Sequence, residues 1–309
     1  MSVLQPFVAP EPGQKPLRVI LRGVLRTLFK PLVRPPMPIA GQRWILRALT
    51  LPTLQAKAVV RSAGMLAGRP CEWHRPLVSG GQVLLYLHGG AFMIGSPATH
   101  RALCSTLARR GGFDVCALDY RLAPEHPFPA ALEDVEAAYR ALLEQGFAPE
   151  QIALAGDSAG GNLSLTGCLR IVEKGLPAPA ALVCLSPVTD LLGEHLHAPE
   201  GGDPMINLPW MEQAGRLYIP DGTPRDLPQL SPLYGDLGAL PALLLQVGED
   251  EVLRNDSLRL AQAASEQGAV VQLERYPQMW HVFQAHVGLL HIADFAVDRI
   301  VEFLRGRGW

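Results

Sequence analysis

Residues 151–162 read QIALAGDSAGGN, and this stretch decides the fold. The short apolar run that begins at Ile152 predicts a buried strand, and the glycines and the serine after it predict an abrupt turn. Leucines and isoleucines at helical spacing, from Leu163 to Val172, then predict a helix. Ser158 therefore stands at the tip of a strand–turn–helix unit, in the G-x-S-x-G pattern of a nucleophile elbow.

The glycines that flank Ser158 have a steric reason. The turn holds the serine backbone in a strained conformation, so only glycine fits at Gly156 and Gly160. The serine oxygen is then lifted clear of the sheet, and the N-terminus of the following helix offers free N–H groups to a developing negative charge. The alternative interpretation is an ordinary Ser-Gly turn between two core elements.

Composition sets the broad class of the protein. The chain has 309 residues, 48% of them hydrophobic and 18% charged, with a net charge of −2. This predicts a globular protein with a large core, and it excludes a disordered chain and a nucleic-acid-binding surface. Five scattered cysteines without metal-ligand spacing predict buried thiols in a reducing compartment. With neither a membrane-spanning apolar run nor a signal peptide, a cytoplasmic location is expected.

Segments with strand-like and helix-like patterns alternate along most of the chain. The expected strands are 71–77, 83–87, 115–120, 152–155, 181–185, 242–247 and 270–276. The expected helices between them are 97–109, 130–144, 163–172, 256–266 and 288–304. This alternation predicts an α/β fold in which a mostly parallel central sheet is flanked by helices, with a core formed by residues 71–189 and 229–309.

Two regions depart from the alternation. Residues 1–16 are rich in proline and predict an extended lead-in. Helical patterns follow at 17–33 and 40–66, and Pro52 is a candidate interruption of the second. The first of these helices is basic and amphipathic, so it either rests on an anionic membrane surface or packs on the domain, and the second interpretation is favoured. Residues 190–228, with six prolines and one short helical stretch, predict an insertion above the sheet.

A serine nucleophile needs a base. In a parallel sheet, functional groups gather where the strands end, so the loops after the last strands are the places to search. His281 follows the strand expected at 270–276, and the chain's other histidines lie in less suitable positions. His195 and His197 lie close together in the insertion, and we expect them to be surface residues, with no metal site.

The base in turn needs a carboxylate behind it. The strand expected at 242–247 is followed by Glu249, Asp250 and Glu251. We assign Asp250 to this role, with its two neighbours as alternatives, because the chain order serine, acid, histidine is that of a hydrolase triad. The negative charge on the substrate needs N–H donors, which the turn after Ser158 and the loop at 88–91 supply.

These residues occur in segments that resemble the bacterial hormone-sensitive-lipase-like carboxylesterases. The matching segments are HGGAF (88–92), DYRLAPEHPFPAALED (119–134), GDSAGGNL (156–163), SPVTDL (186–191), GEDEVLRND (248–256) and MWHVF (279–283). The resemblance implies an α/β-hydrolase fold with a helical cap, built from residues 1–70 and from the insertion 190–228 after the sixth strand. It also implies a serine carboxylesterase that hydrolyses short- to medium-chain acyl esters through an acyl-enzyme, without a cofactor.

The resemblance also implies finer assignments. The oxyanion donors would be the N–H groups of Gly89, Gly90 and Ala159, with Ala91 standing where the family most often has a third glycine. The candidate residues of the substrate pocket are Phe92, Met93, Trp210, Met211 and Trp280, with ordinary core packing as the alternative for each. The MWHVF ending suggests a lactone hydrolase or an acetyl hydrolase as alternatives. The expected partner is a small-molecule ester, and family members often form homodimers through the region that corresponds to residues 270–304.

Overall fold

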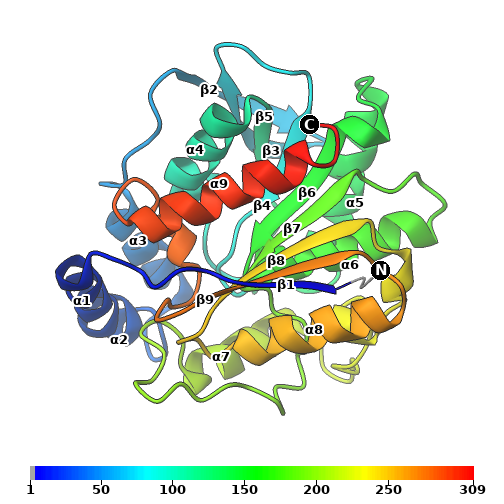
Figure 1. The fold of residues 1–309 in the computed structure, drawn as a ribbon. Coiled ribbons are helices and arrows are strands. Elements are labelled where there is room, and N and C mark those ends of the chain that lie inside the picture. Colours follow the sequence, from blue (N-terminus) through cyan, green and yellow to red (C-terminus); the bar gives the residue numbers. More distant parts are fainter. Residues whose placement is uncertain (1–3) are drawn as a thin grey trace.

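The fold is built on one nine-stranded sheet. In the computed structural model, which describes residues 4–309, the strand order is β1-β9-β8-β7-β6-β4-β5-β3-β2 (Figure 1). The strands are β1 (Leu4–Val8), β2 (Val59–Leu66), β3 (Arg69–Pro76), β4 (Val83–Leu87), β5 (Asp114–Leu118), β6 (Ile152–Asp157), β7 (Ala181–Leu185), β8 (Ala242–Gly248) and β9 (Val271–Tyr276). Only the β2–β3 and β3–β5 pairs are antiparallel, which confirms the predicted mostly parallel sheet.

Helices cover both faces of this sheet. The helices of the core are α4 (Arg101–Gly111), α5 (Ala130–Glu144), α6 (Ala159–Glu173), α8 (Arg254–Glu266) and α9 (His291–Arg305). Strand β4 shows how the two faces are filled, because its side chains alternate and all of them are buried. Leu85 and Leu87 pack with α5, α6 and α8, whereas Leu84 and Tyr86 pack with α4 and α9.

The cap lies at the end of the sheet where the parallel strands finish. It consists of α1 (Lys15–Val24), a π-helical turn (Leu25–Phe29), α2 (Lys30–Leu32), α3 (Ile39–Thr50) and, from the insertion after β7, α7 (Leu208–Tyr218). The helical stretch predicted over 40–66 ends at Thr50, next to the interruption considered at Pro52, and the prediction of helix beyond that point is wrong. Pro52 lacks an N–H and disfavours a helix before it, and the chain then enters strand β2.

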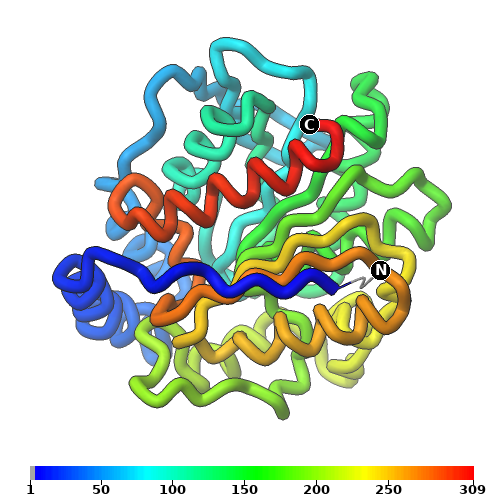
Figure 2. The backbone as a smooth tube through the Cα atoms, in the orientation of Figure 1, coloured from blue at the N-terminus to red at the C-terminus, as the bar shows by residue number. Residues whose placement is uncertain are grey.

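The N-terminal strand differs from the predicted extended lead-in. Residues Leu4–Val8 form β1, which runs parallel to β9 and covers its outer edge. Figure 2 shows this N-terminal segment lying along the chain near residue 270. Residues 1–70 therefore contribute β1, β2 and the start of β3 to the sheet, besides the cap helices.

Two further features bear on the sequence predictions. All five cysteines are buried and carry free thiols, as predicted. Within residues 4–309, we find no helix with the length and apolar character needed to cross a bilayer.

Candidate active site

Ser158 lies at the junction of β6 and α6, in a backbone conformation that non-glycine residues rarely adopt. Its φ is 53° and its ψ is −118°. A Cβ at Gly160 would lie 1.9 Å from the carbonyl oxygen of Leu87, so no larger residue fits there without moving β4. The N–H of Ser158 donates to Leu185 O at 2.8 Å, which ties the turn to β7. The strained elbow predicted from the sequence is present.

His281 meets a buried glutamate. Its Nδ1 lies 3.3 Å from Glu251 Oε1, and Glu251 is fully buried. The other oxygen of that carboxylate accepts hydrogen bonds from Ser186 Oγ at 2.7 Å and from Gly248 N at 3.0 Å. Burial lowers the pKa of His281, but the hydrogen bond and the charge of Glu251 outweigh it, so the pKa lies above its ordinary value. The imidazole is thus held and made more basic by Glu251.

The sequence analysis assigned Asp250 as the carboxylate behind His281, but in the structure His281 contacts Glu251 instead. The Asp250 carboxylate points to the cap and forms an ion pair with Arg22 of α1 at 2.7 Å. Arg22 also donates to Gln278 O at 2.9 Å, three residues before His281. Asp250 therefore connects the cap to the loops after β8 and β9. Its neighbour Glu251 occupies the position behind His281 that was predicted for Asp250.

The loop after β4 also differs from the prediction in one donor. The N–H of Gly89 donates to Asp157 Oδ1 at 3.0 Å, so this N–H is already used. No acceptor for the N–H groups of Gly90 and Ala91 is found among residues 4–309. Ala91 has a φ of 54°, and Ala159 is the first residue of α6, where an N–H has no partner within the helix. The free donors are therefore those of Gly90, Ala91 and Ala159.

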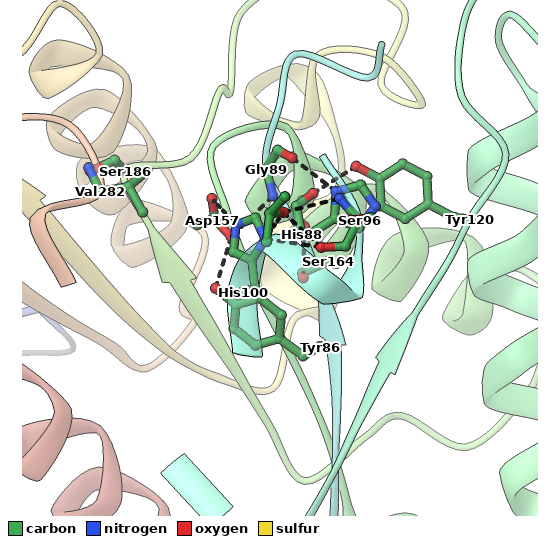
Figure 3. A network of polar contacts seen from close by, with 12 residues as sticks. Tyr86, His88, Gly89, Ser96, His100, Tyr120, Asp157, Ser164, Ser186 and Val282 are labelled. Atoms are coloured by element: carbon green, nitrogen blue, oxygen red, sulfur yellow. Dashed lines mark hydrogen bonds and ion pairs between the residues drawn. The ribbon is translucent and has the colours of Figure 1, made fainter. Parts of the chain in front are cut away.

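Asp157 is the centre of a buried network beneath this loop (Figure 3). It accepts from Tyr86 Oη at 2.8 Å and lies 3.2 Å from His100 Nε2. Burial raises the pKa of Asp157, but the charge and hydrogen bond of His100, together with the Tyr86 hydroxyl, lower it below its ordinary value. Burial lowers the pKa of His100, and Asp157 raises it above its ordinary value. The two groups form a close buried contact that the sequence, in which His100 has no informative motif, did not reveal.

His88 supports the same loop in its neutral form. Burial and the nearby His100 lower its pKa to about 3. Its ring stacks on Tyr120 with centroids 4.3 Å apart, and the Tyr120 hydroxyl donates to His88 O at 2.6 Å. His88 is therefore a packed, uncharged residue that fixes the start of the loop.

Two cavities meet at Ser158. The smaller, about 60 Å³, is lined by Ala91, Phe92, Ser158, Val188, Leu191, Ile206, Trp210, Met211, Ala214, Gly215, Tyr218, Ile219 and Leu253. The larger, about 390 Å³, extends beneath the cap helices and also includes His281, Gly89 and Gly90 in its wall. We call them the small and the large chamber.

The predicted pocket residues divide into two groups. Phe92, Trp210 and Met211 line the small chamber, and Trp210 lines the large one as well. Met93 and Trp280 line neither chamber, and both are fully buried in the core. The sequence shows that each of these side chains is apolar, but it does not show whether the side chain points into a chamber or into the core.

Comparisons with known proteins agree with this geometry. A family model described as alpha/beta hydrolase fold matches residues 84–285. An acetyl-hydrolase of Streptomyces hygroscopicus is 43% identical over 236 residues, which cover 76% of this chain and 79% of that protein. The putative acetyl-hydrolase LipR of Mycobacterium tuberculosis is 35% identical and covers 93% of this chain and 94% of its own. A solved hormone-sensitive lipase from a metagenome library superposes with a TM-score of 0.89 at 35% identity, over 96% of this chain and 99% of that one.

Proposed function

The chain belongs to the bacterial hormone-sensitive-lipase-like carboxylesterases of the α/β-hydrolase superfamily, and we propose that it hydrolyses esters with Ser158 as nucleophile, His281 as base and Glu251 as the carboxylate behind the base. The observation that carries this assignment is the 3.3 Å contact between His281 Nδ1 and Glu251 Oε1. It leaves Nε2 of the imidazole for the serine hydroxyl, and both His281 and Ser158 lie in the wall of the large chamber.

The reaction runs in two halves. Ser158 Oγ forms a bond to the ester carbonyl carbon while His281 Nε2 takes its proton. The tetrahedral intermediate then loses the alkoxy group, which His281 protonates as the bond to the carbonyl carbon breaks. Water attacks the acyl-enzyme in the same way, and the carboxylic acid leaves. Glu251 holds the imidazole in one tautomer and stabilises its cation in both halves.

The oxyanion of each intermediate is held by backbone donors. We assign the N–H groups of Gly90, Ala91 and Ala159, because these are free whereas that of Gly89 is bound to Asp157. A donor of this kind contributes about 3–4 kcal/mol to the transition state in comparable sites. The network around Asp157 acts on this loop from below and has no part in the bond changes.

The proposal is tested by initial rates of p-nitrophenyl acetate hydrolysis. We expect turnover by the wild type and a loss of at least about a thousandfold in Ser158→Ala, with unchanged circular dichroism. A folded Ser158→Ala variant that keeps wild-type activity would remove the serine from the mechanism. A folded wild type that is inactive on all esters would remove the proposed function.

An acetyl hydrolase is a second candidate that uses the same groups. It is supported by relatives named acetyl-hydrolase and by the small chamber beside Ser158. A series of ethyl esters from acetate to decanoate separates the two, because a general carboxylesterase accepts the longer chains.

Two expectations from the sequence stay predictions. The cytoplasmic location is supported by the five unpaired, buried thiols. A homodimer through residues 270–304 would have to use α9 rather than the outer edge of β9, because β1 covers that edge. Light scattering of the purified protein would give the number of chains.

A further inference from the structure

The two chambers differ in size, and Ser158 lies between them. A buried water-sized group needs roughly 10–15 Å³ of such space, so the small chamber of about 60 Å³ takes about four to six non-hydrogen atoms. The large chamber, about 390 Å³, takes several times as many. Only Ser158, Ile206 and Trp210 line both chambers. The acyl part and the alcohol part of an ester bound at Ser158 must therefore enter different chambers.

The position of His281 determines which chamber receives the acyl part of the ester and which receives the alcohol part. The imidazole has to protonate the oxygen of the leaving alcohol, so the alcohol must lie on the side of the histidine. His281 and its neighbours Val282, Ala285 and His286 line the large chamber, and none of them lines the small one. The large chamber is therefore the alcohol side, and the small chamber receives the acyl group.

The small chamber has a rigid end. Phe92 and Tyr218 stack in parallel there, with ring centroids 3.9 Å apart and an interplanar angle of 2°. Tyr218 is almost completely buried, and the ring of Phe128 packs against its edge. A longer acyl chain would have to displace this stack, so the chamber limits acyl length by its walls.

The wall between the chambers is also fixed. Trp210 donates from Nε1 to Gln42 Oε1 at 3.0 Å, and Gln42 is fully buried. The Gln42 amide in turn donates to Met37 O at 2.8 Å and to Gln213 Oε1 at 3.0 Å. These bonds join α3 to α7 and hold the indole in place, so the two chambers stay separate.

The large chamber, in contrast, is apolar and opens to the surface. Leu21, Leu25 and Phe29 line it from one side, and Leu46 and Leu49 of α3 from the other. Val24 and Leu289, which also line it, are 40% and 42% exposed. A bulky apolar alcohol would fill this space and bury its surface against these residues.

We propose that the substrates are esters of a short acyl group, acetyl to about hexanoyl, with a large apolar alcohol, so that the alcohol supplies most of the binding. This inference rests on the proposed esterase function. It differs from that function in a checkable way, because general esterase activity does not require the long chain to be on the alcohol side.

The test uses two isomers, decyl acetate and ethyl decanoate, which have the same atoms but carry the long chain on opposite sides of the ester. We expect kcat/KM for decyl acetate to be higher by at least about tenfold. Equal rates, or faster hydrolysis of ethyl decanoate, would overturn the proposal. Inactivity on both isomers would also overturn it if p-nitrophenyl acetate is hydrolysed, whereas inactivity on that ester too would mean that the proposed function itself has failed.

Variants that fill one chamber test the assignment independently. Leu49→Trp narrows the large chamber and is expected to lower the ratio of decyl acetate to ethyl decanoate rates at least about fivefold. Ala214→Leu narrows the small chamber and is expected to raise the same ratio. Val78→Trp, at a loop position that is 84% exposed, controls for the added indole and should leave the ratio unchanged. A fall in the ratio for Ala214→Leu, or a rise for Leu49→Trp, would reverse the chamber assignment.

Discussion

The core side and the cap side of the site are held together by different interactions. On the core side, Glu251 and Asp157 are buried carboxylates, each with several hydrogen-bond partners. On the cap side, the ion pair between Arg22 and Asp250 leaves the two side chains 21% and 33% exposed, and the surfaces around the large chamber are mostly apolar. We therefore expect the chemistry to depend on the buried polar contacts, and the choice of substrate to depend on the cap. Substitutions on the core side should therefore reduce activity or stability more than substitutions in the cap.

The largest effect is expected for Glu251→Gln. The amide no longer stabilises the imidazolium and can donate to Nδ1, which favours the wrong tautomer, so kcat/KM should fall about a thousandfold to ten-thousandfold. The matched control is Asp250→Asn, at the next residue, for which a loss below about tenfold is expected because Asp250 contacts Arg22 instead. Steady-state rates on p-nitrophenyl acetate measure both. A larger loss in Asp250→Asn would return the role of the acid to Asp250.

Asp157→Asn tests the buried network beneath the loop after β4. It leaves His100 buried without its counter-charge, so the free energy of unfolding should fall by about 3 kcal/mol. The pKa of Asp157 is lowered by folding, so its contribution is present above its unfolded pKa and is lost as the pH falls through its folded pKa. The pKa of His100 is raised by folding, so its contribution is present below its unfolded pKa and is lost as the pH rises through its folded pKa.

The free energy of unfolding should therefore differ most between wild type and Asp157→Asn at about pH 5–6, between the unfolded pKa values of aspartate and histidine. Urea unfolding across this range measures it. Asp298→Asn, which removes a carboxylate that is 63% exposed, should change stability by less than about 0.5 kcal/mol. A difference that stays constant over the whole pH range would mean that the pair is not ionised.

The acid limb of the pH profile of kcat/KM should shift when Glu251 is replaced. The base must be neutral to act, so activity appears as the pH rises through the pKa of His281. Because Glu251 raises this pKa, the acid limb of the wild type should lie above 6.5, the ordinary pKa of histidine, and the limb of Glu251→Gln should shift to lower pH. The residual activity of the variant is sufficient for this measurement if enzyme concentration is increased. An unshifted limb would show that Glu251 does not control the base.

The smallest effect is expected for Arg22→Met on the cap. The variant keeps the aliphatic stem but loses the bonds to Asp250 and to Gln278 O, and a partly exposed pair contributes at most about 1 kcal/mol. We expect kcat on p-nitrophenyl acetate to change less than about threefold, with a larger change in KM for decyl acetate, as the large chamber loosens. A loss of kcat as large as that of Glu251→Gln would contradict the division between core and cap.

Local patterns and chain order were sufficient to predict the elbow and the position of His281 beside the active site. Ser158 lies in a strand–turn–helix pattern that specifies its own geometry, and His281 follows the last strand of a parallel sheet. The choice between Asp250 and Glu251 depended on something no pattern records. Both follow β8, and the turn sends one side chain to Ser186 and His281 and the other to the cap.

Long-range contacts explain the other differences. The N–H of Gly89 appeared free in the sequence because its partner, the Asp157 side chain, comes from another strand. His100 gave no signal for the same reason. Strand β1 contains Pro6 and has no strong strand pattern, and it becomes a strand only because β9 offers its edge.

The pairing of β1 with β9 has a consequence for the order of folding. Leu4 pairs with Val271, so the segment made early in translation finds its partner only when nearly the whole chain has left the ribosome. Helix α1 follows β1 directly, and its Arg22 docks on loops that are also made late. The catalytic core can therefore begin to assemble before its N-terminal cap is seated, and the large chamber is the last part of the enzyme to acquire its walls.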